Sequence, residues 1–216
     1  MRTLKITGLW LALFMLSHVW VYAQSSEQHI EKLVLNKKEK KVFNSRDSSV
    51  TVYIDTLVMK DRSSLQFFGK KDVRLVITHA EIGNNVFITG NGARNNASNF
   101  NIEVNFNKLG SMTVVARGQD AMNGTKTHPN GDAGNVTLIY NANGIKPQTT
   151  DKKAKNFLVV DVRPGGLNVT PSSDVNRIYD QIKSAPTGLR GIPQGQIYSG
   201  SPGKEGEVII KSNIDE

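Results

Sequence analysis

The stretch from residue 117 to residue 132 carries the most chemically capable side chains in the chain. Asp120 and Asp132 supply carboxylates, His128 supplies an imidazole and Arg117 supplies a guanidinium. Carboxylates with nearby amide and backbone oxygens bind calcium, and an imidazole transfers protons near neutral pH. The residues do not follow the order of a calcium-binding loop, so the alternative is a polar surface insertion. We expect these four residues to bind a ligand without a metal ion, on a loop held by a rigid scaffold.

Three clusters of lysine offer a second kind of chemistry. Lys70 and Lys71 form one, which we expect to bind a ligand, and the others lie within residues 37–41 and 152–155. The chain has 27 basic and 19 acidic residues, a net charge of +8; residues 1–23 hold two of the basic ones and no acidic one, which leaves +6. Clustered cations attract anionic polymers, and the interaction weakens with salt. The alternative is that these lysines only solvate turns and protect edge strands.

Signals of catalysis are weak. His79 and Glu81 are two residues apart, so on a strand they share a face and could act as an acid–base or metal-binding pair. No third ligand lies nearby, which favours a solvent-facing pair. The phosphate-binding loop, the Gly-x-Ser-x-Gly elbow and the His-Glu-x-x-His motif are absent, and the chain has no cysteine. We therefore predict no catalytic residue, no cofactor and no disulfide.

The elements that must position these residues are short strands. Residues 99–107 alternate polar and apolar side chains with a period of two, as in a half-buried strand. Similar patterns cover residues 50–54, 73–77, 112–116, 136–140, 157–162 and 207–210. Glycine and asparagine separate them and are typical of tight turns. Val175, Ile178 and Ile182 follow Ser172 and Ser173 at helical spacing and predict one short helix.

The strands suit one of two all-β architectures. Very short strands between residues 57 and 88, together with many asparagines over residues 84–143, favour a right-handed parallel β-solenoid with Gly-rich loop insertions. An antiparallel β-sandwich is the alternative. Glycine recurs at every third position at Gly131/Gly134, Gly188/Gly191 and Gly200/Gly203/Gly206. That spacing permits close packing of polyproline-II segments, and the alternative is flexible loops.

The segments at residues 80–92 and 134–140, with the Gly-rich insertion between them, resemble exported β-helix proteins of bacterial envelopes. In those proteins, loops of the Gly-x-x type interrupt the coils. The resemblance covers residues 50–140 and the C-terminal Gly-x-x tail, although the insertion here is short and irregular. It implies the solenoid fold and does not imply an activity.

The N-terminus predicts export. Arg2 and Lys5 precede an apolar stretch at residues 9–16, and Val21-Tyr22-Ala23 forms a cleavage site before Gln24. A membrane anchor is the alternative, but the apolar run is too short for one and ends at Ser17 and His18. We expect a mature chain without a membrane span, in the periplasm, on the outer surface or secreted.

These observations divide the chain into a signal peptide at residues 1–23, a polar lead-in at 24–48 with one short strand at 32–35, a β-solenoid at 49–170, and a C-terminal part at 171–216. The last part is predicted to hold the helix, the Gly-rich tail and a final strand. The function expected is that of a non-enzymatic structural or adhesive envelope protein. Its expected partners are acidic polysaccharides, envelope glycans or envelope proteins, not nucleic acid. The alternative is a small pectin-lyase-like enzyme acting on polysaccharides.

Overall fold

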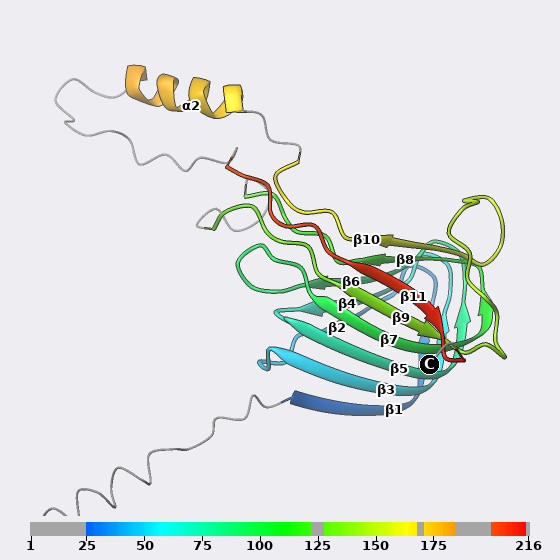
Figure 1. The fold of residues 1–216 in the computed structure, drawn as a ribbon. Helices are drawn as coiled ribbons and strands as arrows, with labels where there is room; N and C mark the ends of the chain where they lie inside the picture. Colours follow the sequence, from blue (N-terminus) through cyan, green and yellow to red (C-terminus); the bar gives the residue numbers. More distant parts are fainter. Residues whose placement is uncertain (1–24, 122–127, 168–170, 185–199, 215–216) are drawn as a thin grey trace, which may run out of the picture.

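The computed structural model describes residues 25–121, 128–167, 171–184 and 200–214. In these residues eleven strands wind into a parallel β-solenoid, in which five coils each give one strand to sheet A and one to sheet B and a final strand joins sheet A (Figure 1). Sheet A consists of β1 (Ser25–Leu35), β3 (Ser49–Met59), β5 (Asp72–Ile82), β7 (Asn99–Leu109), β9 (Val136–Tyr140) and β11 (Val208–Ser212). Sheet B consists of β2 (Lys40–Phe43), β4 (Ser64–Phe68), β6 (Val86–Asn91), β8 (Ser111–Val115) and β10 (Phe157–Asp161).

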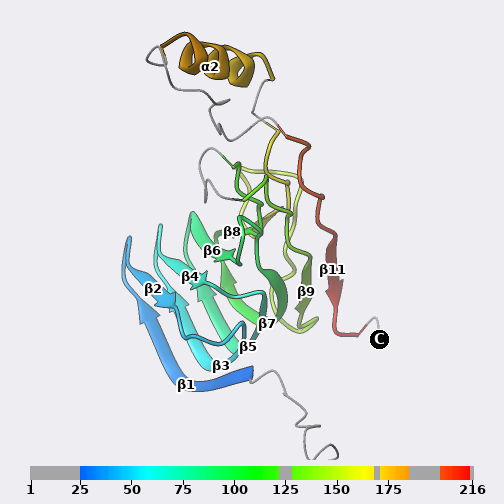
Figure 2. The ribbon, with the colours of Figure 1, turned by 90° about the vertical axis from the view of Figure 1, so that its left-hand side faces the viewer.

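Every strand pair within the two sheets is parallel, and the coils follow one another from β1 to β11 along the molecule (Figure 2). The expected solenoid is therefore confirmed, and the sandwich alternative is excluded because it requires antiparallel pairing. The alternation of apolar and polar residues sets the register. In β3, Val50, Val52 and Ile54 are buried while the residues between them are less buried, and each apolar position pairs with an apolar position of β5.

The predicted lead-in is part of the solenoid. Residues 25–43 form a complete first coil, with β1 eleven residues long instead of the four that the sequence predicts. Leu35 and Phe43 are buried, and the Phe43 ring stacks on the Phe67 ring of the next coil with centroids 4.8 Å apart. The charged residues that make this segment look like a lead-in lie on its outward face and in its turn.

The connections from sheet A to sheet B stack on one another. Lys38, Arg62 and Asn85 hold the same place in three successive turns, and all three have positive φ angles of 65°, 62° and 54°. The amide of Lys38 donates to the Asp61 carbonyl at 3.1 Å, and that of Arg62 donates to the Asn84 carbonyl at 2.9 Å. The turns therefore continue the hydrogen-bond ladders of the sheets around the corner.

On the opposite side of the solenoid, amide side chains continue the ladder where sheet A begins. The Asn99 amide group donates to the Asp72 carboxylate at 2.8 Å, while its oxygen accepts from the Asn135 backbone amide at 3.0 Å. The Asn135 side chain accepts in turn from the backbone amide of Glu207 at 2.9 Å. This ladder gives two of the asparagines of this part of the sequence, Asn99 and Asn135, a structural role.

Glycine-rich segments form a compact bundle beyond the strands of the last coils. The backbone amides of Gly131, Gly165 and Gly203 donate to the carbonyls of Gln119, Gly131 and Gly165 at 2.9, 2.9 and 3.1 Å. The hydrogen bonds recur at every third residue and join segments far apart in the chain. Close packing, which the glycine spacing permits, is present at Gly131/Gly134 and Gly203/Gly206, so the flexible-loop interpretation is wrong for these glycines. Gly188 and Gly191 lie outside the described residues.

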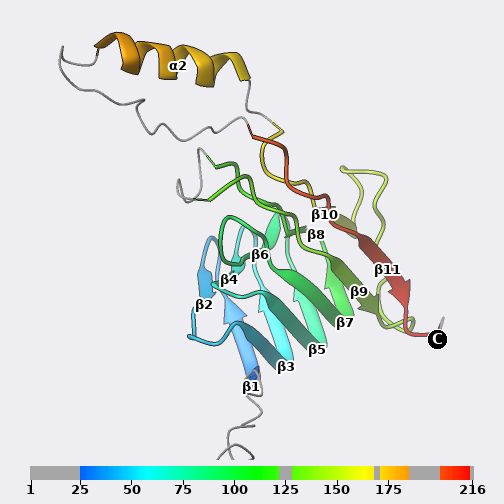
Figure 3. The ribbon, with the colours of Figure 1, turned by 60° about the vertical axis from the view of Figure 1, so that its left-hand side comes forward.

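The predicted helix is present as α2 (Pro171–Ser184). Proline at the first helical position suits its fixed φ angle, so Ser172 and Ser173 lie in the first turn instead of preceding it. In all three views α2 stands away from the coils (Figure 3). No helix in the described part of the chain is long and apolar enough to cross a membrane. The predicted signal peptide lies outside the described residues.

Candidate functional site

The corner where sheet A passes into sheet B collects cationic side chains from distant parts of the chain. The first coil contributes the cluster at residues 37–41, and the fifth contributes that at 152–155. We call this surface the basic corner and define it by the connections between the sheets and the strand ends beside them. Its cations are Lys37, Lys38, Lys40, Lys41, Lys60, Arg62, Lys108, Lys146, Lys152, Lys153 and Lys155.

The charge of the basic corner is not balanced. Its eleven cations face four acidic side chains, Glu39, Asp61, Glu81 and Asp151. The excess of seven charges compares with +6 for residues 24–216 as a whole, so the remainder of that part is close to neutral. All eleven cations are exposed, and none of them belongs to either ion pair found among the described residues.

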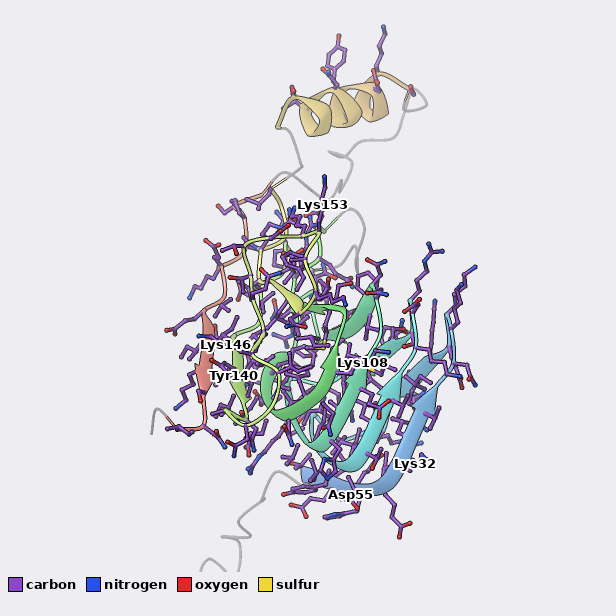
Figure 4. The ribbon with its side chains drawn as sticks, turned by 90° about the vertical axis from the view of Figure 1, so that its right-hand side faces the viewer. Lys32, Asp55, Lys108, Tyr140, Lys146 and Lys153 are labelled. Atoms are coloured by element: carbon purple, nitrogen blue, oxygen red, sulfur yellow. The ribbon has the colours of Figure 1, made fainter. Side chains whose placement is uncertain are left out.

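Figure 4 views the molecule from this corner. Lys108 from the end of β7, and Lys146 and Lys153 from the connection after β9, are spread across the view. Parallel strands lie about 4.8 Å apart, so the first and fifth coils are separated by roughly 19 Å along the solenoid. The basic corner is therefore long enough to contact several charged groups of an extended polymer.

A shallow hollow of about 350 Å³ lies within the basic corner. Lys37, Lys60 and Lys108 line it together with the carboxylates of Asp61 and Glu81. One Asp61 oxygen accepts the Asn84 backbone amide at 2.7 Å, which fixes that carboxylate to the turn. Cations beside a few acceptors over a partly apolar floor suit an acidic sugar, whose carboxylate and hydroxyl groups require both kinds of partner.

The two lysines predicted as a ligand-binding pair have different surroundings. Lys71 is exposed at the start of β5. Lys70 is fully buried, and its ammonium donates to the Ser45 carbonyl at 2.7 Å, to the Ser45 hydroxyl and to the Asp47 carbonyl. The expectation that Lys70 contacts a ligand must be corrected, because its donors are used inside the protein to hold the connection between β2 and β3.

The two carboxylates of the 117–132 stretch are held within the glycine-rich bundle. Asp120 is 6% exposed and accepts the Gly166 backbone amide. Asp132 accepts the Lys204 backbone amide at 2.7 Å. These contacts tie segments of the bundle together, so the structure assigns both carboxylates a structural task and does not bring them together as a calcium site. Among the described residues no group of three or more His, Asp or Glu side chains could hold a metal ion.

The other two residues of that stretch are partly exposed. The backbone carbonyl of His128 accepts the Asn95 side-chain amide at 3.3 Å. Arg117 lines a second hollow of about 350 Å³ with Asn91, Val115, Gly118, Gln119 and Asp120. Arg117 therefore keeps the access to solvent that a ligand contact requires.

Two charged residues of neighbouring segments complete the surroundings of Arg117. The Arg163 guanidinium donates two hydrogen bonds to Asp161, at 2.8 and 2.7 Å. These hydrogen bonds lower the pKa of Asp161 against the opposing effect of its partial burial, and the charge of Arg117 adds a smaller effect in the same direction. Asp161 thus remains ionised beside two arginines.

The His79–Glu81 pair is exposed on one face of β5, as the alternation predicts. Ala80 between them is fully buried. The two side chains therefore point to the outside of sheet A, away from the core.

Sequence reasoning missed two exposed aromatic rings on the outer face of sheet B. Phe68 is 44% exposed and Phe87 is 39% exposed, in the neighbouring strands β4 and β6. In each strand, side chains at alternate positions face the core, and Phe67 in β4 and Ile88 in β6 lie at such inward positions. Their neighbours Phe68 and Phe87 therefore face outward. Strict use of the alternation would have placed both rings outside.

Comparison of the chain with family models, with curated proteins and with solved structures found no match. The fold places the protein in the structural class of parallel β-solenoids, and its site is defined by its own geometry.

Proposed function

We propose that this protein is an exported, non-enzymatic structural or adhesive component of the cell envelope that binds anionic glycans at the basic corner. The observation that supports the proposal is the gathering of eleven cations from the first, second, fourth and fifth coils on one corner that holds four acidic side chains. A solenoid is a rigid, extended scaffold, so the backbone positions of its cations keep a fixed spacing and binding does not have to order the backbone.

The spacing of the cations favours a polymer over a small anion. Lys37, Lys60 and Lys108 surround the hollow of the corner, whereas Lys146 and the 152–155 cluster lie one coil further on. Exposed ion pairs contribute about 0.2–1 kcal/mol each, so a single contact binds weakly. Several such contacts on one chain produce useful affinity, and all of them weaken when salt screens the charges.

Charge reversal at three corner positions tests the proposal. The variant Lys37→Glu/Lys60→Glu/Lys108→Glu is compared with Arg46→Glu/Lys183→Glu/Lys204→Glu, which makes the same charge change on exposed residues away from the corner. We expect the corner variant to lose alginate binding at least tenfold, since three contacts of about 0.5–1 kcal/mol disappear. The control variant retains binding. Equal losses in both variants would show that only net charge matters, and catalytic breakdown of the glycan would contradict a non-enzymatic role.

A further inference from the structure

The outer face of sheet B is chemically unlike an ordinary solvated sheet surface. Val42, Phe68 and Phe87 expose 41%, 44% and 39% of their surface on three neighbouring strands. Outward-facing polar side chains that donate and accept hydrogen bonds lie among these apolar groups. They are Gln66, Thr89, Asn91 and Thr113.

The strand register fixes how the two rings are arranged. Phe87 pairs with Ser64, and Phe68 pairs with Asn91, so the rings are offset by four residues along adjacent strands. With a rise of about 3.3 Å per residue and a strand spacing of about 4.8 Å, their Cα atoms are roughly 14 Å apart. The rings are therefore separate platforms along a line and not one apolar cluster.

One cationic group lies level with each ring, two strands away across the sheet. Lys40 pairs with Ser64 in the register and so lies near Phe87, where the face meets the basic corner. At the other end, Phe68 pairs with Asn91, which lines the same hollow as Arg117. Arg117 forms no ion pair among the described residues. The face thus carries one ring and one cation near each end of its strands, with polar groups between the two ends.

We propose that the outer face of sheet B binds an acidic sugar chain, with Phe87 and Phe68 as stacking platforms for sugar rings and Arg117 as a partner for a sugar carboxylate. Aromatic faces pack against apolar surfaces, and the C–H faces of sugar rings provide such surfaces. The neighbouring amide and hydroxyl groups match sugar hydroxyls. The face is continuous with the basic corner, so the inference rests on the proposed function and identifies the ligand as a polyuronate, a polymer of acidic sugar rings.

The test compares an anionic polymer that has sugar rings with one that has none. An oligouronate and inorganic polyphosphate are each titrated into the purified protein and into the variant Phe68→Leu/Phe87→Leu. Leucine preserves apolar volume and removes the ring. Val34→Ala, which changes an exposed apolar residue on sheet A, is the matched control. We expect the double variant to bind the oligouronate at least tenfold more weakly and polyphosphate within twofold of the unchanged protein. We expect Val34→Ala to alter neither.

Four other results would each overturn the inference, and each has a different meaning. Unchanged oligouronate binding in the double variant would exclude the stacking role, while a loss in the corner variant would still support the proposed function. Equal losses of affinity for both polymers would show that the two substitutions disturb the fold and do not remove a specific sugar contact. A dimer in sedimentation experiments that dissociates on Phe68→Leu/Phe87→Leu would assign the face to a second copy of the chain. Absence of oligouronate binding by the unchanged protein, with binding of polyphosphate, would exclude the sugar chain as its ligand.

Discussion

Replacing Gly118 by alanine is expected to destabilise the glycine-rich bundle strongly. A Cβ atom at Gly118 would lie 2.7 Å from the carbonyl carbon of Gly131 and 2.8 Å from the nitrogen of Gly165. Carbon atoms in contact are normally about 3.5–4.0 Å apart, so backbone on both sides must move by about 1 Å. That shift disturbs the hydrogen bond from Gly118 to Arg163 (3.0 Å) and the one from Gly165 to Gly131 (2.9 Å).

The magnitude follows from these two effects. Overpacking costs about 1–3 kcal/mol, and each of the two weakened hydrogen bonds costs about 1 kcal/mol, so we expect a loss of about 3–5 kcal/mol. For a chain of this size the loss lowers Tm by about 6–20 °C. The assay is thermal unfolding followed by circular dichroism, with Gly200→Ala as the control because a Cβ there has no neighbour within 4 Å. A Tm for Gly118→Ala equal to that of Gly200→Ala would refute the close-packed bundle.

Three further changes test other parts of the structure. Lys70→Met is expected to lower stability by about 3 kcal/mol in denaturant unfolding, because it leaves buried oxygens of Ser45 and Asp47 without their donor, whereas Lys71→Met has little effect. Asp161→Asn is expected to lower Tm slightly at pH 7. Because folding depresses the pKa of Asp161, its stabilisation is present above the unfolded value of about 3.9 and disappears as pH falls from there through the folded pKa, so the two melting curves converge in acid. Asn130→Ala removes side-chain bonds to Ala121 and to residues 200 and 201, so hydrogen exchange near Ala121 is expected to accelerate while exchange in β5 does not change.

Much of the fold could be predicted because alternation and turn residues are local signals. The strand at residues 99–107, the final strand and the helix near Val175 were all expected close to their observed places. The first coil was missed because charged side chains surround its apolar residues Ile30, Leu33 and Leu35, and because the alternation shifts by one residue between Ile30 and Leu33. The glycine spacing permitted close packing but equally suited flexible loops, because the packing partners of Gly131 come from residues distant in sequence.

The candidate site was predicted in part. The lysine clusters at residues 37–41 and 152–155 are visible in the sequence, but their shared corner depends on the number of residues in each coil. The burial of Lys70 could not be predicted, because nothing in its local sequence distinguishes this buried, hydrogen-bonded lysine from the exposed Lys71. The outward orientation of Phe68 and Phe87 was not predicted, because each ring is next to another apolar residue and adjacent apolar residues make the core-facing side of a strand harder to identify.

The most direct test of the account is a titration of the purified protein with an oligouronate at low and at high salt concentration. The basic corner predicts saturable binding at low salt that is lost at high salt, because the Debye length falls from about 10 Å at 0.1 M to about 3 Å at 1 M. Affinity that does not depend on salt, or no binding at low salt, would contradict an anionic-glycan function for this corner.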